Sequence, residues 1–178
     1  VAGQYLDYFN DQEVFLSSLP IELRQQVLLR LYHRDYGWNQ VERWQDSMPE
    51  VNLDLGRKDI KQLIKKCRLY IATYNATTYL ETLAWNVPTI MFWNPGHWEL
   101  NEQAKPYFEL LEKEGIFHTT PQSAANKMIE IWDDVDSWWY SNEIQRARKV
   151  FINQYAFVPE EPLNLLQDLF EHINESEV

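Results

Sequence analysis

The chain has 178 residues, 45% of them apolar, which suits one hydrophobic core with an appended helical layer. Its formal net charge of −11 argues against a nucleic-acid backbone or an anionic membrane as the main partner, because both require a positive protein face. No apolar run approaches the roughly 20 residues that span a bilayer, and the single Cys67 excludes an internal disulfide, so we expect a cytoplasmic protein without a transmembrane segment.

Short apolar runs alternate with amphipathic stretches in the first half of the chain, a pattern typical of strands joined by helices. In chain order, this pattern predicts a helix near 11–18, a short helix from Pro20, strands over 27–33 and 51–55, a helix over 58–66 and a strand over 69–73. The polar stretch 39–50 has no predicted element. The basic segment 57–68 has its apolar residues at helical spacing, which places its lysines on a solvated outer face.

In the second half of the chain, Thr78 and Glu81 fit a capping box, in which both side chains accept hydrogen bonds from amides at a helix start. The pattern then predicts, in order, a helix over 78–86, a strand over 87–93, a helix from Leu100 that Gly115 ends, a strand over 116–118, and helices from Thr120, from Ser141 and after Pro159. Trp138 and Trp139 are expected to pack between the helical tail and the sheet.

Together these elements predict an α/β fold, a Rossmann-like parallel sheet of about five strands with helices on both faces and a C-terminal helical tail. Residues 1–158 would form this domain, and residues 159–178 a C-terminal helix and acidic tail that pack on it or extend from it. Parallel strands joined by right-handed crossovers direct the loops that follow them to one edge of the sheet. A ligand is therefore expected at that edge.

The loops expected at this edge are rich in hydrogen-bond donors, imidazoles and aromatic rings. Their members, strand by strand, are His33, Arg34, Tyr36 and Trp38, then Gly56 and Arg57, then Tyr74, Asn75, Thr77 and Thr78, then Asn94, Gly96, His97 and Trp98, then His118, Thr119 and Thr120. Aromatic faces can stack a sugar or a base, and helix N-termini can offer amides to a phosphate. No carboxylate cluster has metal-ligand spacing, so neither a metal nor a cofactor is expected.

Several of these residues also have a purely structural interpretation. Thr78 and Glu81 suit a helix cap alone, and Asn75 suits a left-handed turn. His33 and Arg34 also suit a solvent-exposed strand end. Only the expected convergence of the loops favours a ligand over these alternatives.

Three segments, RLYHRDYGW (30–38), YNATTYLETLAWNVPTIMFW (74–93) and GIFHTTPQSAA (115–125), carry a resemblance to a known family. They resemble the C-terminal half of a glycosyltransferase of the two-domain GT-B architecture. More narrowly, they resemble the LIC12162 family, a bacterial family proposed to make surface polysaccharides. The resemblance covers roughly residues 10–157 and is most specific in the strand, turn and helix of the second segment.

The resemblance implies roles for the turn and helix that follow the third strand. Asn75, Thr77 and Thr78 would set amides and hydroxyls against the diphosphate of a nucleotide-sugar donor. Glu81, about one turn into the helix, would accept from ribose hydroxyls, which conflicts with its use as a cap. The turn lacks the glycine that such enzymes usually carry there.

The resemblance also implies roles in two further loops. Arg34 would offset phosphate charge, and His33 beside it would touch phosphate or sugar. The loop from Asn94, including His97, would face the transferred sugar, and Glu102 is added to this set. The catalytic residues remain unassigned.

The resemblance further implies a larger protein. The chain starts with Val1, and GT-B enzymes use a second domain to bind the acceptor, so we expect this chain to be a fragment that needs the other domain for activity. The partners would be a nucleotide-sugar and, through that domain, a glycan acceptor. Two alternatives stay open: the donor domain of a CDP-polyol phosphotransferase, and a non-catalytic α/β interaction module. A sugar-nucleotide epimerase is less favoured, because its paired acids and histidines are not found here.

Overall fold

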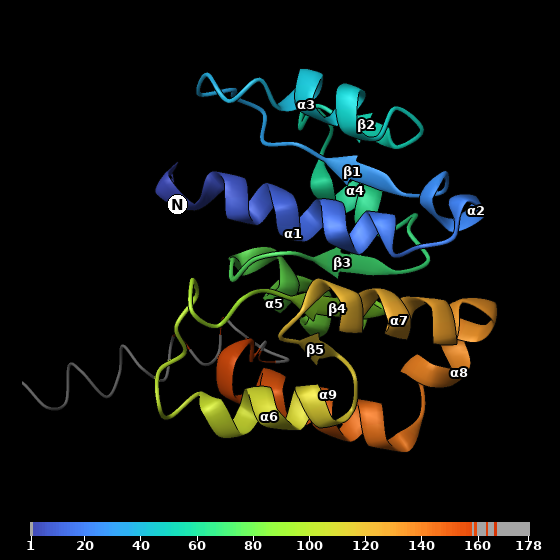
Figure 1. Ribbon diagram of the computed structural model, residues 1–178. Helices are drawn as coiled ribbons and strands as arrows, with labels where there is room; N and C mark the ends of the chain where they lie inside the picture. The colour runs from blue at the N-terminus through green and yellow to red at the C-terminus, as the bar shows by residue number, and fades with distance from the viewer. Residues whose placement is uncertain (1, 158, 160–162, 164–165, 167–178) are drawn as a thin grey trace, which may run out of the picture.

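The computed structural model describes residues 2–157, Pro159, Leu163 and Leu166 (Figure 1). In its first half, the elements are η1 (Ala2–Gln4), α1 (Tyr5–Ser17), α2 (Ile21–Arg24), β1 (Leu28–Arg30), α3 (Gln40–Ser47), β2 (Asn52–Asp54) and α4 (Ile60–Ile64). In its second half, they are β3 (Tyr70–Ala72), α5 (Thr77–Ala84), β4 (Thr89–Phe92), α6 (Lys105–Lys113), β5 (Phe117–His118), α7 (Pro121–Ile131), η2 (Trp132–Asp134), α8 (Val135–Trp139) and α9 (Asn142–Tyr155). No helix in the described part of the chain is long and apolar enough to cross a membrane.

All five predicted strands are present, and every strand pair is parallel, which confirms the α/β class. The single sheet of about five strands is wrong, because the strands form a two-stranded sheet, β1-β2, and a three-stranded sheet, β3-β4-β5. The two sheets are held together by packed side chains and not by hydrogen bonds between strands. Leu31 and Val51 beside the first sheet share one hydrophobic cluster with Ile90 and Phe92 of β4.

Strand β4 is fully buried and divides the core into two parts. Ile90 and Phe92 belong to the cluster that contains α1 and α7, whereas Met91 and Trp93 belong to the cluster that contains α5, α6 and α9. This alternation follows from the two-residue period of a strand. Helices α1 and α7 pack against each other on the side that faces the viewer in Figure 1, where Phe15 of α1 stacks on Phe92 with ring centroids 5.0 Å apart.

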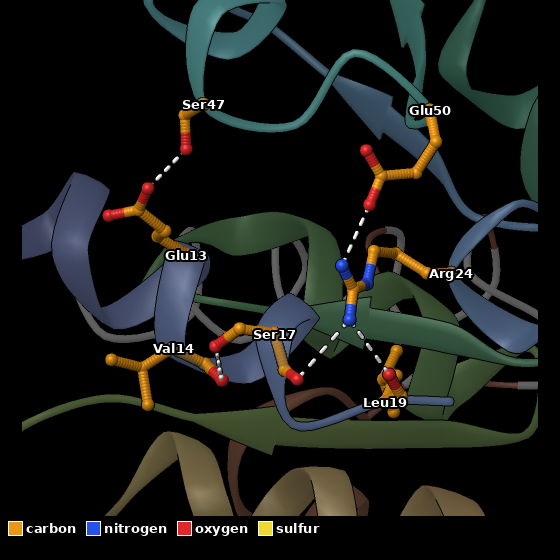
Figure 2. A network of polar contacts seen from close by, with 7 residues as sticks. All are labelled: Glu13, Val14, Ser17, Leu19, Arg24, Ser47 and Glu50. Atoms are coloured by element: carbon orange, nitrogen blue, oxygen red, sulfur yellow. Dashed lines mark hydrogen bonds and ion pairs between the residues drawn. The ribbon is translucent and has the colours of Figure 1, made fainter. Parts of the chain in front are cut away.

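A polar network fastens the end of α1 to the loop before β2 (Figure 2). The guanidinium of Arg24 in α2 pairs with Glu50 at 2.7 Å and donates to the carbonyls of Leu19 at 3.1 Å and Ser17 at 3.3 Å. A second contact joins Ser47 of α3 to Glu13 of α1. Helices α1, α2 and α3 are therefore held together at this end by charge-assisted and neutral hydrogen bonds.

Two helix starts test the capping predictions. A helix was expected from Thr120, and Thr120 is the N-cap of α7, with its hydroxyl accepting from the Ser123 amide at 3.3 Å. The capping box at Thr78 and Glu81 is wrong: α5 begins at Thr77 with Ala76 as its N-cap, and no side chain caps it. The extended backbone of Ala76 starts the helix two residues earlier than the box requires, so Thr78 already lies within the first turn.

Other differences concern the polar stretch and the tail. The stretch 39–50 contains α3, which buries Trp44 against Phe9 of α1. Trp139 is fully buried beside the sheet, as expected for the packing of the helical tail. The predicted helix and acidic tail over 159–178 fall outside the described residues, apart from Pro159, Leu163 and Leu166.

Candidate functional site

A pocket of about 480 Å³ lies at the carboxyl ends of three parallel strands. The residues that leave these strands line it in pairs: Leu31 and Tyr32 after β1, Thr73 and Tyr74 after β3, and Trp93 and Asn94 after β4. The first half of α1 lines another side with Tyr5, Tyr8, Asp11 and Gln12, which we call the α1 wall. The loops after β1, β3 and β4 thus converge on one concave site, which is the usual location for a ligand in an α/β fold.

Aromatic rings make much of the pocket surface. Tyr5 of the α1 wall stacks on Trp38 with centroids 4.3 Å apart. Tyr74 touches Tyr8 edge-on at 5.8 Å and lies 6.0 Å from Trp98 of the loop after β4. These contacts fix the rings of four separate segments relative to one another and present flat apolar faces to a ligand.

Three polar side chains form a closed hydrogen-bonded cluster in this pocket. The Gln12 amide nitrogen donates to the Tyr8 hydroxyl at 2.8 Å and to the Thr73 hydroxyl at 2.9 Å. The two hydroxyls are themselves 3.0 Å apart. Burial raises the pKa of Tyr8 to about 12, so its phenol is protonated at neutral pH.

An imidazole of the loop after β4 lies beside acidic side chains of α1. Burial raises the pKa of Asp11, and the nearby His97 partly opposes that shift. The His97 ring nitrogen lies 3.9 Å from a carboxylate oxygen of Asp7, one helical turn before Asp11. This side of the pocket therefore offers carboxylate acceptors next to an imidazole.

Arg30 also lines the pocket, but other groups engage its charge. It pairs with the buried Asp54 at 2.5 Å and donates to the carbonyls of Lys58 at 2.9 Å and Gly56 at 3.3 Å. Because its partner is a buried carboxylate, Arg30 brings little net positive charge to the pocket.

A smaller pocket of about 130 Å³ adjoins the first and shares Leu31, Tyr32 and Gln40 with it. The imidazole of His33 and the guanidinium of Arg57 line it. Asp35 also lines it, but its carboxylate accepts from three amides, those of Trp38 at 2.7 Å, Gly37 at 2.8 Å and Gln40 at 3.0 Å. Those amides, that of Gln40 first, lower the pKa of Asp35.

A family model described as LIC12162 family transferase matches residues 1–170. The chain belongs to the LIC12162 family of transferases. No match to this family member was found among curated proteins or among solved structures.

The residues proposed from the sequence of this LIC12162 family transferase are divided between the pockets and the surface. Asn94 and His97 line the larger pocket, and His33 lines the smaller one. Arg34 is exposed, with its guanidinium carbon 5.3 Å from the ring centre of the pocket residue Tyr36. These residues are gathered at the loops after β1 and β4.

The remaining predicted residues line neither pocket. The Asn75 side chain accepts from the Tyr79 hydroxyl at 3.0 Å, while Thr77, Thr78 and Glu81 lie in the first turns of α5. Glu102 is 84% exposed at its side chain and pairs with Lys105. The start of α5 thus adjoins the pocket residues Thr73 and Tyr74 without forming part of the lining.

His118 was expected at the same edge and instead is a buried structural residue. Its Nε2 atom lies 3.1 Å from the Gly115 carbonyl and its Nδ1 atom 2.7 Å from the Ser123 hydroxyl. Because a carbonyl only accepts, Nε2 carries the hydrogen and Nδ1 accepts from Ser123. Burial lowers the pKa of His118, which favours this neutral form.

The α1 wall was missed in the sequence. The predicted helix began near residue 11, whereas α1 begins at Tyr5. Tyr5, Tyr8 and Gln12 recur at the spacing of one helical face, and this was the available signal. Among the described residues, no group of three or more His, Cys, Asp or Glu side chains could hold a metal ion.

Proposed function

We propose that this chain is the donor-binding domain of a nucleotide-sugar-dependent glycosyltransferase of surface-polysaccharide synthesis, with the Rossmann-like arrangement of a GT-B C-terminal domain. The observation that carries the proposal is the aromatic pocket at the carboxyl ends of β1, β3 and β4. Membership of a transferase family supports it. An aromatic, polar cavity in this position suits the ring systems of a nucleotide-sugar.

The two adjoining pockets suggest how a donor would lie. Its rings would occupy the larger pocket against aromatic faces, and its diphosphate would lie near His33 and Arg57 of the smaller pocket, with the exposed Arg34 close by. Amides at the start of α5 would add partial positive charge. This division assigns the charged part of the donor to the side of the site that carries Arg57, His33 and Arg34.

The proposed reaction is a displacement at the anomeric carbon. An acceptor hydroxyl oxygen forms the new bond to that carbon and gives its proton to a general base, while the bond to the diphosphate oxygen breaks. The nucleoside diphosphate leaves with the bonding electron pair, and its negative charge is stabilised by Arg34 and His33. We assign the acceptor site and the base to another domain.

A thermal-shift screen tests the proposal with UDP, CDP, GDP, dTDP and their sugars. A ligand at 100 times its Kd should add about 2.7 kcal/mol to the free energy of unfolding, which raises the melting temperature visibly. Replacement of a charge-assisted phosphate contact in Arg34→Ala should weaken nucleotide binding by about tenfold in calorimetry. Arg146→Ala is the matched control, since Arg146 is an exposed arginine of α9 that lines neither pocket.

The outcomes separate the proposal from its alternatives. Stabilisation by uridine, guanosine or thymidine diphosphate sugars supports a glycosyltransferase donor site. A response to cytidine nucleotides alone would transfer the assignment to a polyol-phosphate donor. If none of these nucleotides stabilises the protein, the donor-site proposal is wrong.

A further inference from the structure

We infer that the α1 wall is the subsite for the sugar ring of the donor, and that the cluster of Tyr8, Gln12 and Thr73 donates one hydrogen bond to an oxygen of that ring. This inference rests on the proposed function and adds the part of the ligand that the larger pocket recognises. It assigns a specificity role to residues of α1, a helix that precedes all the strands of the fold.

The hydrogens of the cluster lead to this conclusion. The Gln12 amide has two hydrogens, and both are used, one toward Tyr8 and one toward Thr73. A single hydrogen lies between the Tyr8 and Thr73 hydroxyls, whichever of them donates it. Each hydroxyl carries one hydrogen, so the second is left over.

That remaining hydrogen has no acceptor within the described part of the chain. Tyr8 and Thr73 both line the larger pocket, so an oxygen of a bound ligand can accept it there. A ligand that displaces water from this part of the pocket would leave the hydrogen without a partner unless it supplies an acceptor, which favours a ligand with an oxygen at this point. The cluster is thus a neutral donor whose position is fixed by its own hydrogen bonds.

Asp11 supplies a hydrogen-bond acceptor on the same α1 wall. Its half-buried carboxylate follows Tyr8 by three residues and precedes Gln12, so it lies on the same face of α1 and lines the same pocket. A carboxylate accepts hydrogen bonds, whereas the cluster donates one. A ring with neighbouring hydroxyl groups satisfies both, because each hydroxyl donates and accepts.

The charges argue against a phosphate at this wall. Tyr8, Gln12 and Thr73 carry no positive charge, and the carboxylates of Asp7 and Asp11 on α1 would repel an anion. Arg30 is paired with Asp54, whereas the guanidinium of Arg57 lines the smaller pocket. The apolar faces of Tyr74 and Trp98 can instead contact the C–H face of a sugar ring.

Calorimetry with paired ligands tests this assignment. Each nucleotide-sugar that binds the wild type is compared with its free nucleoside diphosphate in the double variant Tyr8→Phe with Thr73→Val. Removal of both hydroxyls should weaken nucleotide-sugar binding about fivefold or more and leave nucleoside diphosphate binding within about twofold. Asp11→Asn, which preserves the shape of the side chain, should produce the same selective loss.

Tyr107→Phe is the matched control, because it removes a tyrosine hydroxyl from α6, away from the pocket. Circular dichroism and melting temperature check that each variant is folded. Should the double variant not fold, Asp11→Asn decides the question on its own. Equal losses for the nucleotide-sugar and the free diphosphate, or no loss for either, would overturn the inference.

A second arm does not depend on the nucleotide. Saturation-transfer NMR with free glucose, galactose and mannose should give signals with the wild type that fall in the Asp11→Asn variant. If no nucleotide binds, the proposed function is wrong, and this arm still decides the sugar subsite. Absence of any saccharide signal with the wild type, together with no nucleotide-sugar binding, overturns the inference as well.

Discussion

Gly56 lies where the loop after β2 passes the end of β1, and its backbone is left-handed with φ +72°. A Cβ atom at this position would lie 2.7 Å from the Leu31 carbonyl oxygen and 2.8 Å from the His33 amide nitrogen. Both neighbours are backbone atoms that cannot move aside independently. This close approach sets the position of the loop after β1, which contributes to both pockets.

Substitution of Gly56 should lower the free energy of unfolding more than substitution of Gly37, which also has a left-handed backbone but has open space around it. Gly37 has φ +87° and nothing within 4 Å of its added Cβ. Gly37→Ala should lower the free energy of unfolding by about 1 kcal/mol, and Gly56→Ala by at least about 2 kcal/mol, because the second adds a clash to the strain. Urea unfolding measures both, and equal losses would show that the loop relaxes around the new methyl group.

The buried His118 should make the free energy of unfolding depend on pH. Burial lowers its pKa from the ordinary value of 6.5, so near and below that pH the unfolded chain binds a proton that the folded chain resists. The contribution of His118 is therefore complete above pH 6.5 and is lost as the pH falls toward the lowered value. The free energy of unfolding should fall between pH 7.5 and pH 5.5, two values chosen to lie about one unit either side of a free histidine.

The variant His118→Gln should lose less stability than the wild type over the same pH interval. Its glutamine can still reach one of the two partners, Gly115 or Ser123, but has no proton to bind. His33→Gln serves as the control for an exposed histidine. A wild-type pH response in His118→Gln would assign the acid sensitivity to other groups.

At the scale of elements, the joint between α5 and α9 depends on Asn86, which follows the C-cap of α5. Asn86 has a left-handed backbone, φ 58°, and its side-chain oxygen accepts from the Trp139 indole and the Gln145 amide, each at 3.0 Å. Arg148 of α9 donates to the Leu83 carbonyl at 2.7 Å and to Gln145 at 3.2 Å. The buried carbonyl of Leu83 in the last turn of α5 thus finds a donor in the helical tail.

Loss of the Arg148 side chain should therefore loosen this joint. Arg148→Ala should lower the free energy of unfolding by about 2 kcal/mol, because a charged donor to a buried carbonyl is removed. Arg146→Ala, at an exposed position of the same helix, should change it by less than about 0.5 kcal/mol. Thermal unfolding of the two variants compares them directly, and equal effects would show that α9 is held by its apolar face alone.

The elements differ in how well their sequences predicted them. The run over 87–93 was assigned correctly as a strand, because its residues are apolar on both faces, as expected for a strand covered by helices on each side. The N-cap of α5 was assigned two residues late, at Thr78 instead of Ala76, since the extended conformation of Ala76 depends on its surroundings rather than on a capping side chain. Helix α3 was missed because most of its residues are polar, and only Trp44 and Gln40 are buried.

At the scale of the molecule, the small sheet β1-β2 has no core of its own. Its neighbours Leu31 and Val51 belong to the same cluster as Phe15 of α1 and Phe92 of β4. The two sheets should consequently unfold together. Far-UV circular dichroism and tryptophan fluorescence, which reports on Trp44 near the first sheet and Trp93 beside the second, should give superimposable urea transitions.

The variant Phe92→Ala also tests whether the two sheets unfold together, because Phe92 lies in the hydrophobic cluster that both sheets share. The loss of a fully buried phenylalanine should lower the free energy of unfolding by about 3–5 kcal/mol, and both probes should shift equally. A transition that splits into two, with fluorescence and dichroism no longer coincident, would show that β1-β2 folds as a separate unit.

The location of the site was predictable from topology, and its composition was not. Parallel strands alone direct their following loops to one edge, so Asn94 and His97 could be placed at the pocket. The α1 wall comes from a helix whose contact with Thr73 joins residues more than 60 positions apart in the sequence, and no local pattern predicts such a contact. The residues at the start of α5 were also expected at this edge, but they do not line the pocket. Their position in the chain does not reveal whether their side chains reach the cavity.

The attachment of α1 has a mechanical consequence. Arg24 holds only its C-terminal end, at Ser17 and Leu19, whereas Tyr5 and Tyr8 contribute to the pocket from the other end. At about 1.5 Å per residue, the 13-residue helix is some 20 Å long, and along that length Phe9, Gln12 and Phe15 tie it to Trp44, Thr73 and Phe92. A disturbance at Arg24 would reach the binding surface only by shifting these packed side chains, so a substitution there should lower the melting temperature before it alters ligand affinity.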